Sequence, residues 1–122
     1  MQNSNVQDAE IILKSAYQHF NNRDIEATLS AMHADVDWPN GMEGGFEHGH
    51  EAVRNYWTRQ WKMFDPHVDP VQFKLEEDGR INVTVHQVVH DIEGKLLVDQ
   101  MIHHIYTIEG GLIKNMEIKN DD

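Results

Sequence analysis

Three segments in the second half of the chain decide the fold: INVTVHQVVHDI at Ile81–Ile92, KLLVDQMIHHIYTI at Lys95–Ile108 and LIKNMEIK at Leu112–Lys119. Each is rich in the β-branched and aromatic residues that favour an extended chain. Glu93-Gly94 and Gly110-Gly111 separate them, and short turns of this kind connect neighbouring antiparallel strands. The segments therefore predict three consecutive strands of an antiparallel sheet.

The rest of the chain adds further extended segments and three helices. One strand is expected from Val71 to about Glu76, a short one at Val36–Trp38, and a second short extended piece at Phe46–His48. Apolar residues recur at helical intervals in three places, which predicts helices over Val6–Phe20, after the N-cap Asp24, and over His50–Phe64. Helices gathered ahead of an antiparallel sheet indicate a single α+β domain over residues 1–122. A twisted sheet that curls around these helices would form a cone with a hollow interior.

Two of the long strands place polar residues on one alternating face, because side chains alternate with a period of two. His86 and Val88 share a face of one strand, and Gln100, Ile102 and His104 share a face of the next. Histidine and glutamine mixed with apolar side chains suit the wall of a ligand pocket better than a dry core. We therefore predict a cavity on this side of the sheet.

The register of the hairpin decides which of these side chains meet. A turn at Ile92–Gly94 with Asp91 opposite Lys95 places His86 opposite Gln100. A shift of one residue would turn His86 to the other face of the sheet.

Composition narrows the range of partners. The formal net charge is −11 and the acidic residues are scattered, which argues against nucleic acid and anionic membranes as partners. No segment has the roughly 20 apolar residues that cross a bilayer, and Met1–Asp8 is too polar for a signal peptide. The chain has no cysteine, so disulfides and thiolate chemistry are excluded. We expect a cytoplasmic protein.

Four short motifs follow one another along the chain: Asp24–Ala27, Ala34–Trp38, Gly49–Val53 and His104–Ile113. In this order and spacing they resemble the nuclear transport factor 2-like superfamily, and within it the SnoaL-like and ketosteroid-isomerase-like branch. The resemblance covers nearly the whole chain. It implies a cystatin-like α+β barrel, in which a cone-shaped, curved antiparallel sheet wraps around three helices. Because this fold hosts isomerases, cyclases, dehydratases, hydrolases and plain binding modules, the function has to be argued from the site.

The resemblance to the ketosteroid isomerases fails at one position that matters. Their general-base aspartate lies just before a proline on the first strand, and Trp38 stands there in this chain. Their oxyanion-hole tyrosine aligns with Ala16, or with Tyr17 if the following loop is read one residue differently. Their oxyanion-hole aspartic acid aligns with His104, and a supporting tyrosine aligns with Trp57. The missing base argues against steroid isomerisation.

His104 and His86 are the candidate acid/base residues, since an imidazole titrates near pH 6.5 and exchanges protons at neutral pH. The alternative is that one or both are structural histidines bonded to neighbouring elements. The expected cavity wall comes from the first strand, the aromatic third helix and the long strands, with one member added by the resemblance: Trp38, Tyr56, Trp57, Val88, Gln100, Ile102 and Met116. The aromatic members would equally suit the core.

Metal binding is not predicted. His103 and His104 are adjacent on a strand, so their side chains point to opposite faces. His86 and His90 share a face but lie about 13 Å apart along the strand. The run His48–His50 has no partner at helical spacing. We therefore expect neither a metal nor another cofactor.

Two functions remain open. The first is a cofactor-independent isomerase, cyclase or lyase that acts on a small, partly apolar carbonyl compound. In that case His104 would be the acid/base, and His86 and Gln100 would orient the substrate. The second is a non-catalytic ligand-binding or accessory domain with the same cavity, which needs only volume and aromatic walls.

The other face of the strands predicts a homodimer. An apolar stripe is expected on the outer face of the sheet, formed by Val83, Val85, Gln87, Val89, Leu97, Met101 and Ile105. Exposed apolar patches of this kind usually mark interfaces.

Overall fold

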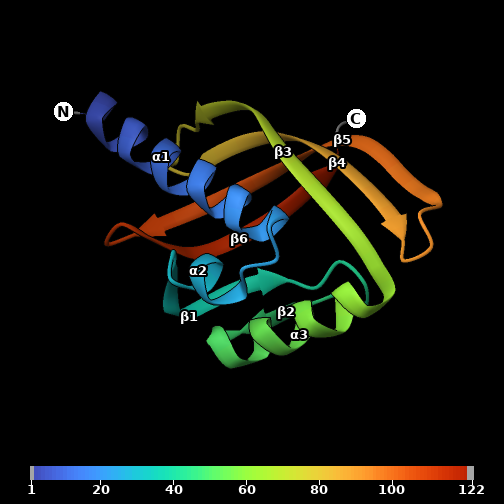
Figure 1. Ribbon diagram of the computed structural model, residues 1–122. Helices are drawn as coiled ribbons and strands as arrows, with labels where there is room; N and C mark the ends of the chain where they lie inside the picture. The colour runs from blue at the N-terminus through green and yellow to red at the C-terminus, as the bar shows by residue number, and fades with distance from the viewer. Residues whose placement is uncertain (1, 121–122) are drawn as a thin grey trace.

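The computed structural model describes residues 2–120, with side chains from Gln7 onward, as three helices and a six-stranded sheet (Figure 1). The helices are α1 (Gln2–Asn21), α2 (Ile25–Leu29) and α3 (Gly49–Met63). The strands are β1 (Met32–Pro39), β2 (Phe46–His48), β3 (Phe64–Leu75), β4 (Ile81–Asp91), β5 (Leu96–Glu109) and β6 (Leu112–Asn120). Their order in the sheet is β2-β1-β6-β5-β4-β3.

The sheet confirms the predicted α+β architecture. Strands β3 to β6 pair antiparallel in chain order, and the helices lie along one side of the curved sheet (Figure 1). The sheet is not closed, because β2 and β3 are its two edges. Strand β1 runs parallel to β6, a pairing that the alternation pattern did not predict.

Two local predictions about the helices can be compared directly with the structure. The Asp24 carboxylate accepts a hydrogen bond from the Ala27 N–H at 3.2 Å, which confirms Asp24 as the N-cap of α2. Helix α3 ends at Met63 and passes directly into β3, so β3 starts well before Val71. It includes Pro66, which has no N–H to donate, and an edge strand tolerates this because one of its sides carries no ladder.

The β4–β5 hairpin has the predicted turn but not the predicted register. The Asp91 N–H donates to the Lys95 carbonyl at 2.9 Å, so the tip of the hairpin closes as expected. Farther from the tip, Val89 pairs with Val98 and the register shifts. Leu97 is therefore one extra residue in β5, which is a β-bulge.

The bulge determines which face of β4 meets the helices. His104 lies opposite Val83, and paired residues share a face of the sheet. His86 lies opposite Met101 instead of Gln100, so it points to the convex face. The prediction that His86 and Val88 face the helices was wrong for this reason.

The core fills the space between the helices and the concave face of the sheet. The same shift of register turns the β4 members of the stripe predicted for a dimer to this concave side: Val83, Val85, Gln87 and Val89. Val83 and Val85 are fully buried there, against fully buried residues of α1 and α3 such as Leu13 and Val53. Met101 pairs with His86 and lies on the convex face, as predicted.

Candidate functional site

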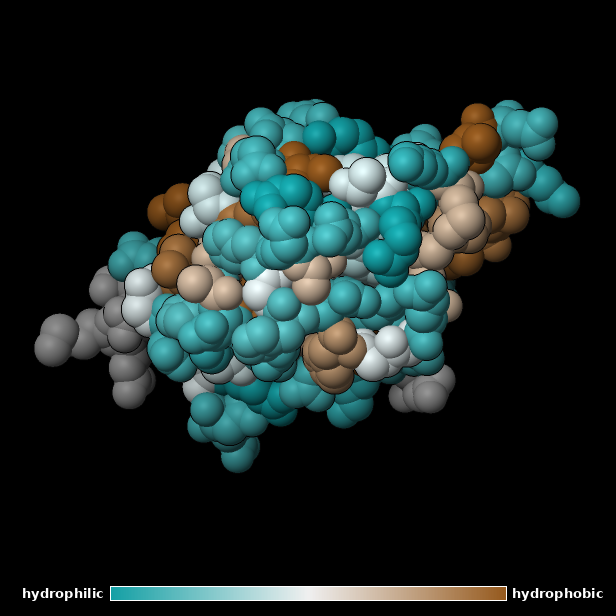
Figure 2. Space-filling view, turned by 90° about the horizontal axis from the view of Figure 1, so that it is seen from below, coloured by the Kyte–Doolittle hydropathy of each residue, from teal (hydrophilic) through white to brown (hydrophobic). Residues whose placement is uncertain are grey.

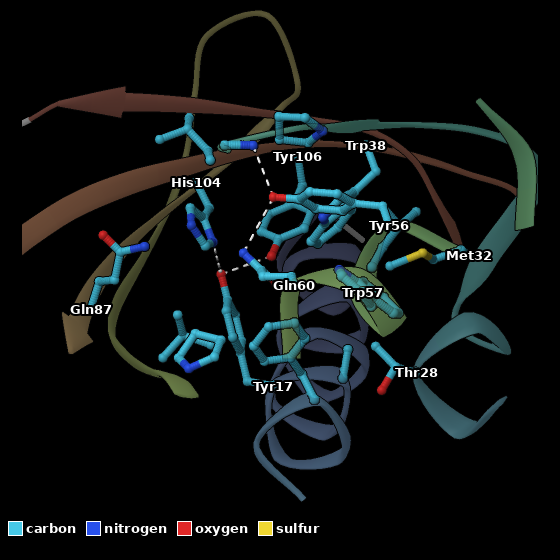
Figure 3. A pocket seen from close by; sticks show the side chains of 18 residues that line it. Tyr17, Thr28, Met32, Trp38, Tyr56, Trp57, Gln60, Gln87, His104 and Tyr106 are labelled. Carbon is cyan, nitrogen blue, oxygen red and sulfur yellow. Dashed lines mark hydrogen bonds between the residues drawn. The ribbon is translucent and has the colours of Figure 1, made fainter. Parts of the chain in front are cut away.

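A cavity of about 90 Å³ lies between the helices and the concave face of the sheet (Figure 3). Residues of α1, α2 and α3, of β1 and the segment after it, and of the long strands line it. The aromatic and polar members are Tyr17, Phe20, Thr28, Trp38, Tyr56, Trp57, Gln60, Gln87, His104 and Tyr106. The volume has room for several water molecules, and is below the roughly 300–1,000 Å³ of pockets that hold drug-sized ligands.

Trp57 is the centre of an aromatic wall on one side of the cavity. It is almost completely buried, and its ring meets the edges of Trp38 and Phe20 at centroid distances of 5.5 Å each. Trp61, one turn further along α3, stacks on it at 5.8 Å but does not line the cavity. The aromatic stripe predicted on α3 therefore serves both the core and the cavity wall.

A chain of three hydrogen-bonded side chains forms the opposite wall. The Tyr106 hydroxyl donates to the Tyr17 hydroxyl oxygen at 2.8 Å, and the Tyr17 hydroxyl lies 2.8 Å from His104 Nδ1 (Figure 3). All three residues are buried. Helix α1 supplies Tyr17, and alternate positions of β5 supply His104 and Tyr106, which therefore share the concave face.

This environment keeps all three side chains neutral. Burial, with the neighbouring His103 as a smaller cause, lowers the pKa of His104 from 6.5 to about 3. Burial likewise raises the pKa of Tyr17 and of Tyr106 well above the ordinary value. Since Tyr106 donates to Tyr17, the proton of Tyr17 is free to be donated to His104 Nδ1. The ring proton of His104 is then on Nε2.

Nε2 is the ring nitrogen of His104 that remains for a hydrogen bond to a ligand. It has no hydrogen-bond partner among the described residues. In the described residues, Trp61 Nε1 is the only fully buried side-chain N or O atom without a hydrogen-bond partner. His104 Nε2 also has no partner, so it cannot be fully buried and keeps some exposed surface. His104 is also one of the residues that line the cavity.

Tyr56 places a second hydroxyl group at the cavity (Figure 3). Its oxygen accepts from the Gly41 N–H at 3.0 Å and lies 3.3 Å from Nε2 of Gln60, which donates to it. Both contacts occupy the oxygen as an acceptor, so the Tyr56 proton remains available for donation. Burial raises the pKa of Tyr56, and the hydroxyl is protonated at neutral pH.

The loop that supplies the Gly41 N–H is held by Asn40, whose side chain is buried. Its Oδ1 accepts from the backbone N–H groups of Met42 and Glu43 at 3.0 and 2.7 Å. Its Nδ2 donates to the carboxylates of Glu43 and Glu47 at 2.9 and 2.8 Å. Four bonds from one amide fix the backbone that positions the hydroxyl of Tyr56.

The structure brings four of the predicted site residues together at the cavity: Trp38, Tyr56, Trp57 and His104. Ile102 and Met116 are buried in the concave-side core and do not line it. Gln100 is exposed, and its amide donates to Gln87 Oε1 at 2.8 Å.

The remaining two predicted site residues lie on the convex face. His86 pairs there with the exposed carboxylate of Asp99, at 2.7 Å. Val88 lies opposite Asp99 in the ladder and does not line the cavity.

Several polar lining residues lay outside the predicted site, among them Tyr106, Gln60 and Gln87. Strand parity places Tyr106 on the same face as His104, but the predicted site did not include it. Gln60 lies one helical turn after Tyr56 on α3, so helical spacing could have identified it. Gln87 was assigned to the outer face, and no local signal revealed the bulge that turns it inward.

Among the described residues, no group of three or more histidine, aspartate or glutamate side chains is placed to hold a metal ion. No helix in the described part of the chain is long and apolar enough to cross a membrane.

Comparison with known proteins places the chain in a family. The model of the SnoaL-like domain family matches residues 13–116. No curated protein matches the chain. Among solved structures, TerC co-crystallized with polyporic acid is 27% identical, with a TM-score of 0.80 and coverage of 93% of this chain and 92% of that chain.

Two further structures are similar. An NTF2-like protein from Burkholderia pseudomallei is 26% identical with a TM-score of 0.80, over 93% of this chain and 91% of that chain. A Mycobacterium tuberculosis protein in complex with estradiol-17beta-hemisuccinate is 21% identical with a TM-score of 0.77, over 91% and 92% of the two chains. At this identity the second likeness concerns the fold alone. Because the family match spans most of the chain, the protein belongs to the SnoaL-like domain family of the NTF2-like superfamily.

Proposed function

We propose that the protein binds a small, partly apolar carbonyl compound in this cavity, and that His104 Nε2–H donates a hydrogen bond to its oxygen. The Tyr106–Tyr17–His104 chain is the observation on which the proposal rests. It occupies Nδ1 of His104 and leaves Nε2–H without a described partner, on a residue that lines the cavity. Trp38 and Trp57 offer flat apolar surfaces for the rest of the ligand.

The chemistry that this arrangement favours is polarisation of a carbonyl. A buried neutral donor stabilises negative charge that develops on oxygen, and it needs no rearrangement during the reaction. Isomerisation, cyclisation and elimination next to a carbonyl all develop such charge. With a pKa of about 3, His104 acts here as a hydrogen-bond donor and not as a base at neutral pH.

Non-catalytic binding is the second candidate, and one observation favours it. The described residues that line the cavity include no aspartate, glutamate, lysine or arginine. None of them is therefore a base that titrates near neutral pH. A substrate that must lose a proton would need water or its own functional group as the acceptor.

The size of the cavity limits how a ligand binds. About 90 Å³ is less than the roughly 150 Å³ of a cavity known to accept benzene, so even a compound with a single ring needs some movement of the cavity wall. TerC was co-crystallized with polyporic acid. We propose that a ligand of that size enters this chain only if the loop anchored by Asn40 moves.

Carbonyl vibrational spectroscopy tests the proposal. We expect the carbonyl stretch of isotope-labelled acetophenone to move to lower wavenumber when it binds the wild-type protein. The shift should disappear with His104→Phe and persist with the matched control His103→Phe, because His103 points to the opposite face. An equal shift in the His104 variant would show that His104 does not donate to the ligand.

We also propose a homodimer, although its apolar contact surface differs from the predicted stripe. Ile92, Leu96, Leu97 and Met101 are exposed at and near the β4–β5 hairpin. Figure 2 shows hydrophobic side chains gathered at the corresponding end of the molecule. Exposed apolar groups of this kind favour association with a second copy. Sedimentation equilibrium at micromolar concentration should give a dimer, and a strict monomer would contradict the proposal.

A further inference from the structure

We infer that this cavity selects uncharged ligands and excludes carboxylates, an inference that rests on the proposed function and specifies the ligand class. It concerns which carbonyl compounds enter, rather than what happens to them. Three observations support it: the neutral wall of the cavity, the pairing of the nearest cations, and two carboxylates behind one of the donors.

The wall offers only neutral groups. No described lining residue is an aspartate, glutamate, lysine or arginine, and burial keeps His104 uncharged at neutral pH. The lining residues that carry donors include His104, Tyr56, Gln60 and Gln87, all of them neutral. They can bind the oxygen of a ketone, aldehyde, phenol or quinone. They provide no positive charge to offset the loss of hydration of an anion.

The two arginines near the cavity wall are already paired. Arg59 lies over the Tyr56 ring at 5.9 Å, but its guanidinium donates to the Glu43 carboxylate at 3.0 Å. Arg23 donates to the Asp65 carboxylate and to the carbonyl of Pro66. Neither cation is free to meet a ligand carboxylate without breaking an ion pair.

Two carboxylates lie behind the Tyr56 hydroxyl. Glu43 and Glu47 converge on Asn40 Nδ2, and their charges contribute to raising the pKa of Tyr56. The same negative field acts on any anion that accepts a hydrogen bond from Tyr56. The net charge of the chain, −11, acts in the same direction at longer range.

Acetophenone and benzoate make a matched pair of probes, because they have nearly the same shape and differ in charge. Quenching of tryptophan fluorescence reports binding, since Trp38 and Trp57 line the cavity. We expect benzoate to bind the wild-type protein at least about tenfold more weakly than acetophenone at neutral pH. The difference should persist at about 0.5 M salt, where the screening length is roughly 4 Å, because its origin lies inside the cavity. Loss of the difference at high salt would assign it to net charge and overturn the inference.

A charge placed at the cavity should reverse the selection. Gln87→Lys adds a cation at the cavity edge and should strengthen benzoate binding about tenfold or more. Gln18→Lys makes the same change of net charge on the exposed surface of α1 and should leave benzoate affinity within about twofold. Equal gains in both variants would overturn the inference.

The outcomes separate this inference from the proposed function. If acetophenone and benzoate bind the wild-type protein equally well, charge selection is wrong while ligand binding stands. If neither compound quenches the fluorescence or binds by calorimetry, the proposed function fails and the inference fails with it.

Discussion

Tyr17→Phe is the substitution that tests the buried hydrogen-bond chain most severely. The hydroxyl of Tyr17 joins Tyr106 and His104, and all three side chains are buried. Its removal leaves the hydroxyl of Tyr106 without an acceptor and Nδ1 of His104 without a donor. Each of these two buried groups costs about 1–3 kcal/mol when it loses its partner, so we expect the free energy of unfolding to fall by roughly 2–6 kcal/mol. A domain in the upper part of the usual stability range of about 5–15 kcal/mol would still fold.

Urea unfolding followed by tryptophan fluorescence measures this loss. Tyr106→Phe is the matched control, because it removes an end of the chain and leaves the Tyr17–His104 bond intact. Its expected cost is about 1 kcal/mol, the typical net value of a single hydrogen bond. If Tyr17→Phe costs no more than Tyr106→Phe, Tyr17 does not bridge two buried partners and the reasoning is refuted.

Four further predictions follow. The pKa of His104 is about 3 in the folded protein and 6.5 in the unfolded chain. Its contribution to stability is therefore complete above pH 6.5 and is lost as the pH falls toward 3, because only the unfolded chain takes up the proton in that range. By pH 4.5 the wild type should therefore lose roughly 2–3 kcal/mol relative to His104→Gln, and parallel curves would contradict this. Tyr56→Phe should weaken acetophenone binding about 3- to 10-fold by calorimetry; an unchanged affinity would exclude Tyr56 as a donor. Asn40→Ala should cost about 1–3 kcal/mol in urea unfolding and speed amide exchange in residues 41–45; unchanged exchange would show that other contacts hold the loop. His86→Ala should leave acetophenone affinity within about twofold and change stability by less than about 1 kcal/mol, because its contact with Asp99 is exposed; a large loss of binding would return His86 to the site.

The long strands could be predicted from the sequence because the turns that connect them are formed by adjacent residues. The Asp91–Lys95 closure follows from a few adjacent residues, and it is present. The bulge at Leu97 is different, because no local sequence pattern marks it. It shifts the pairing of β4 with β5 by one residue, and the side chains of β4 therefore point to the opposite faces from those expected. Alternation on β5 therefore placed His104 correctly, whereas the inferred register placed His86 and Gln87 on the wrong faces.

Other features depend on contacts between distant parts of the chain. The parallel pairing of β1 with β6 joins segments from opposite ends of the chain, and no local pattern encodes it. The Tyr17–His104 hydrogen bond spans 87 residues. Only the resemblance to the isomerases suggested that Tyr17 and His104 share a site, with Ala16 as the other option. The extension of β3 back to Phe64 depends on its edge position, where Pro66 removes no hydrogen bond that the sheet needs.

The protonation state of His104 tests the central claim most directly. Nitrogen-15 NMR of the imidazole ring distinguishes Nδ1 from Nε2 and neutral from charged forms. From pH 5 to 8 we expect a single neutral form, with the proton on Nε2 and with Nδ1 accepting from Tyr17. Addition of acetophenone should then shift the Nε2 resonance more than the Nδ1 resonance. A ring that becomes charged near pH 6.5, or one with its proton on Nδ1, would contradict the account.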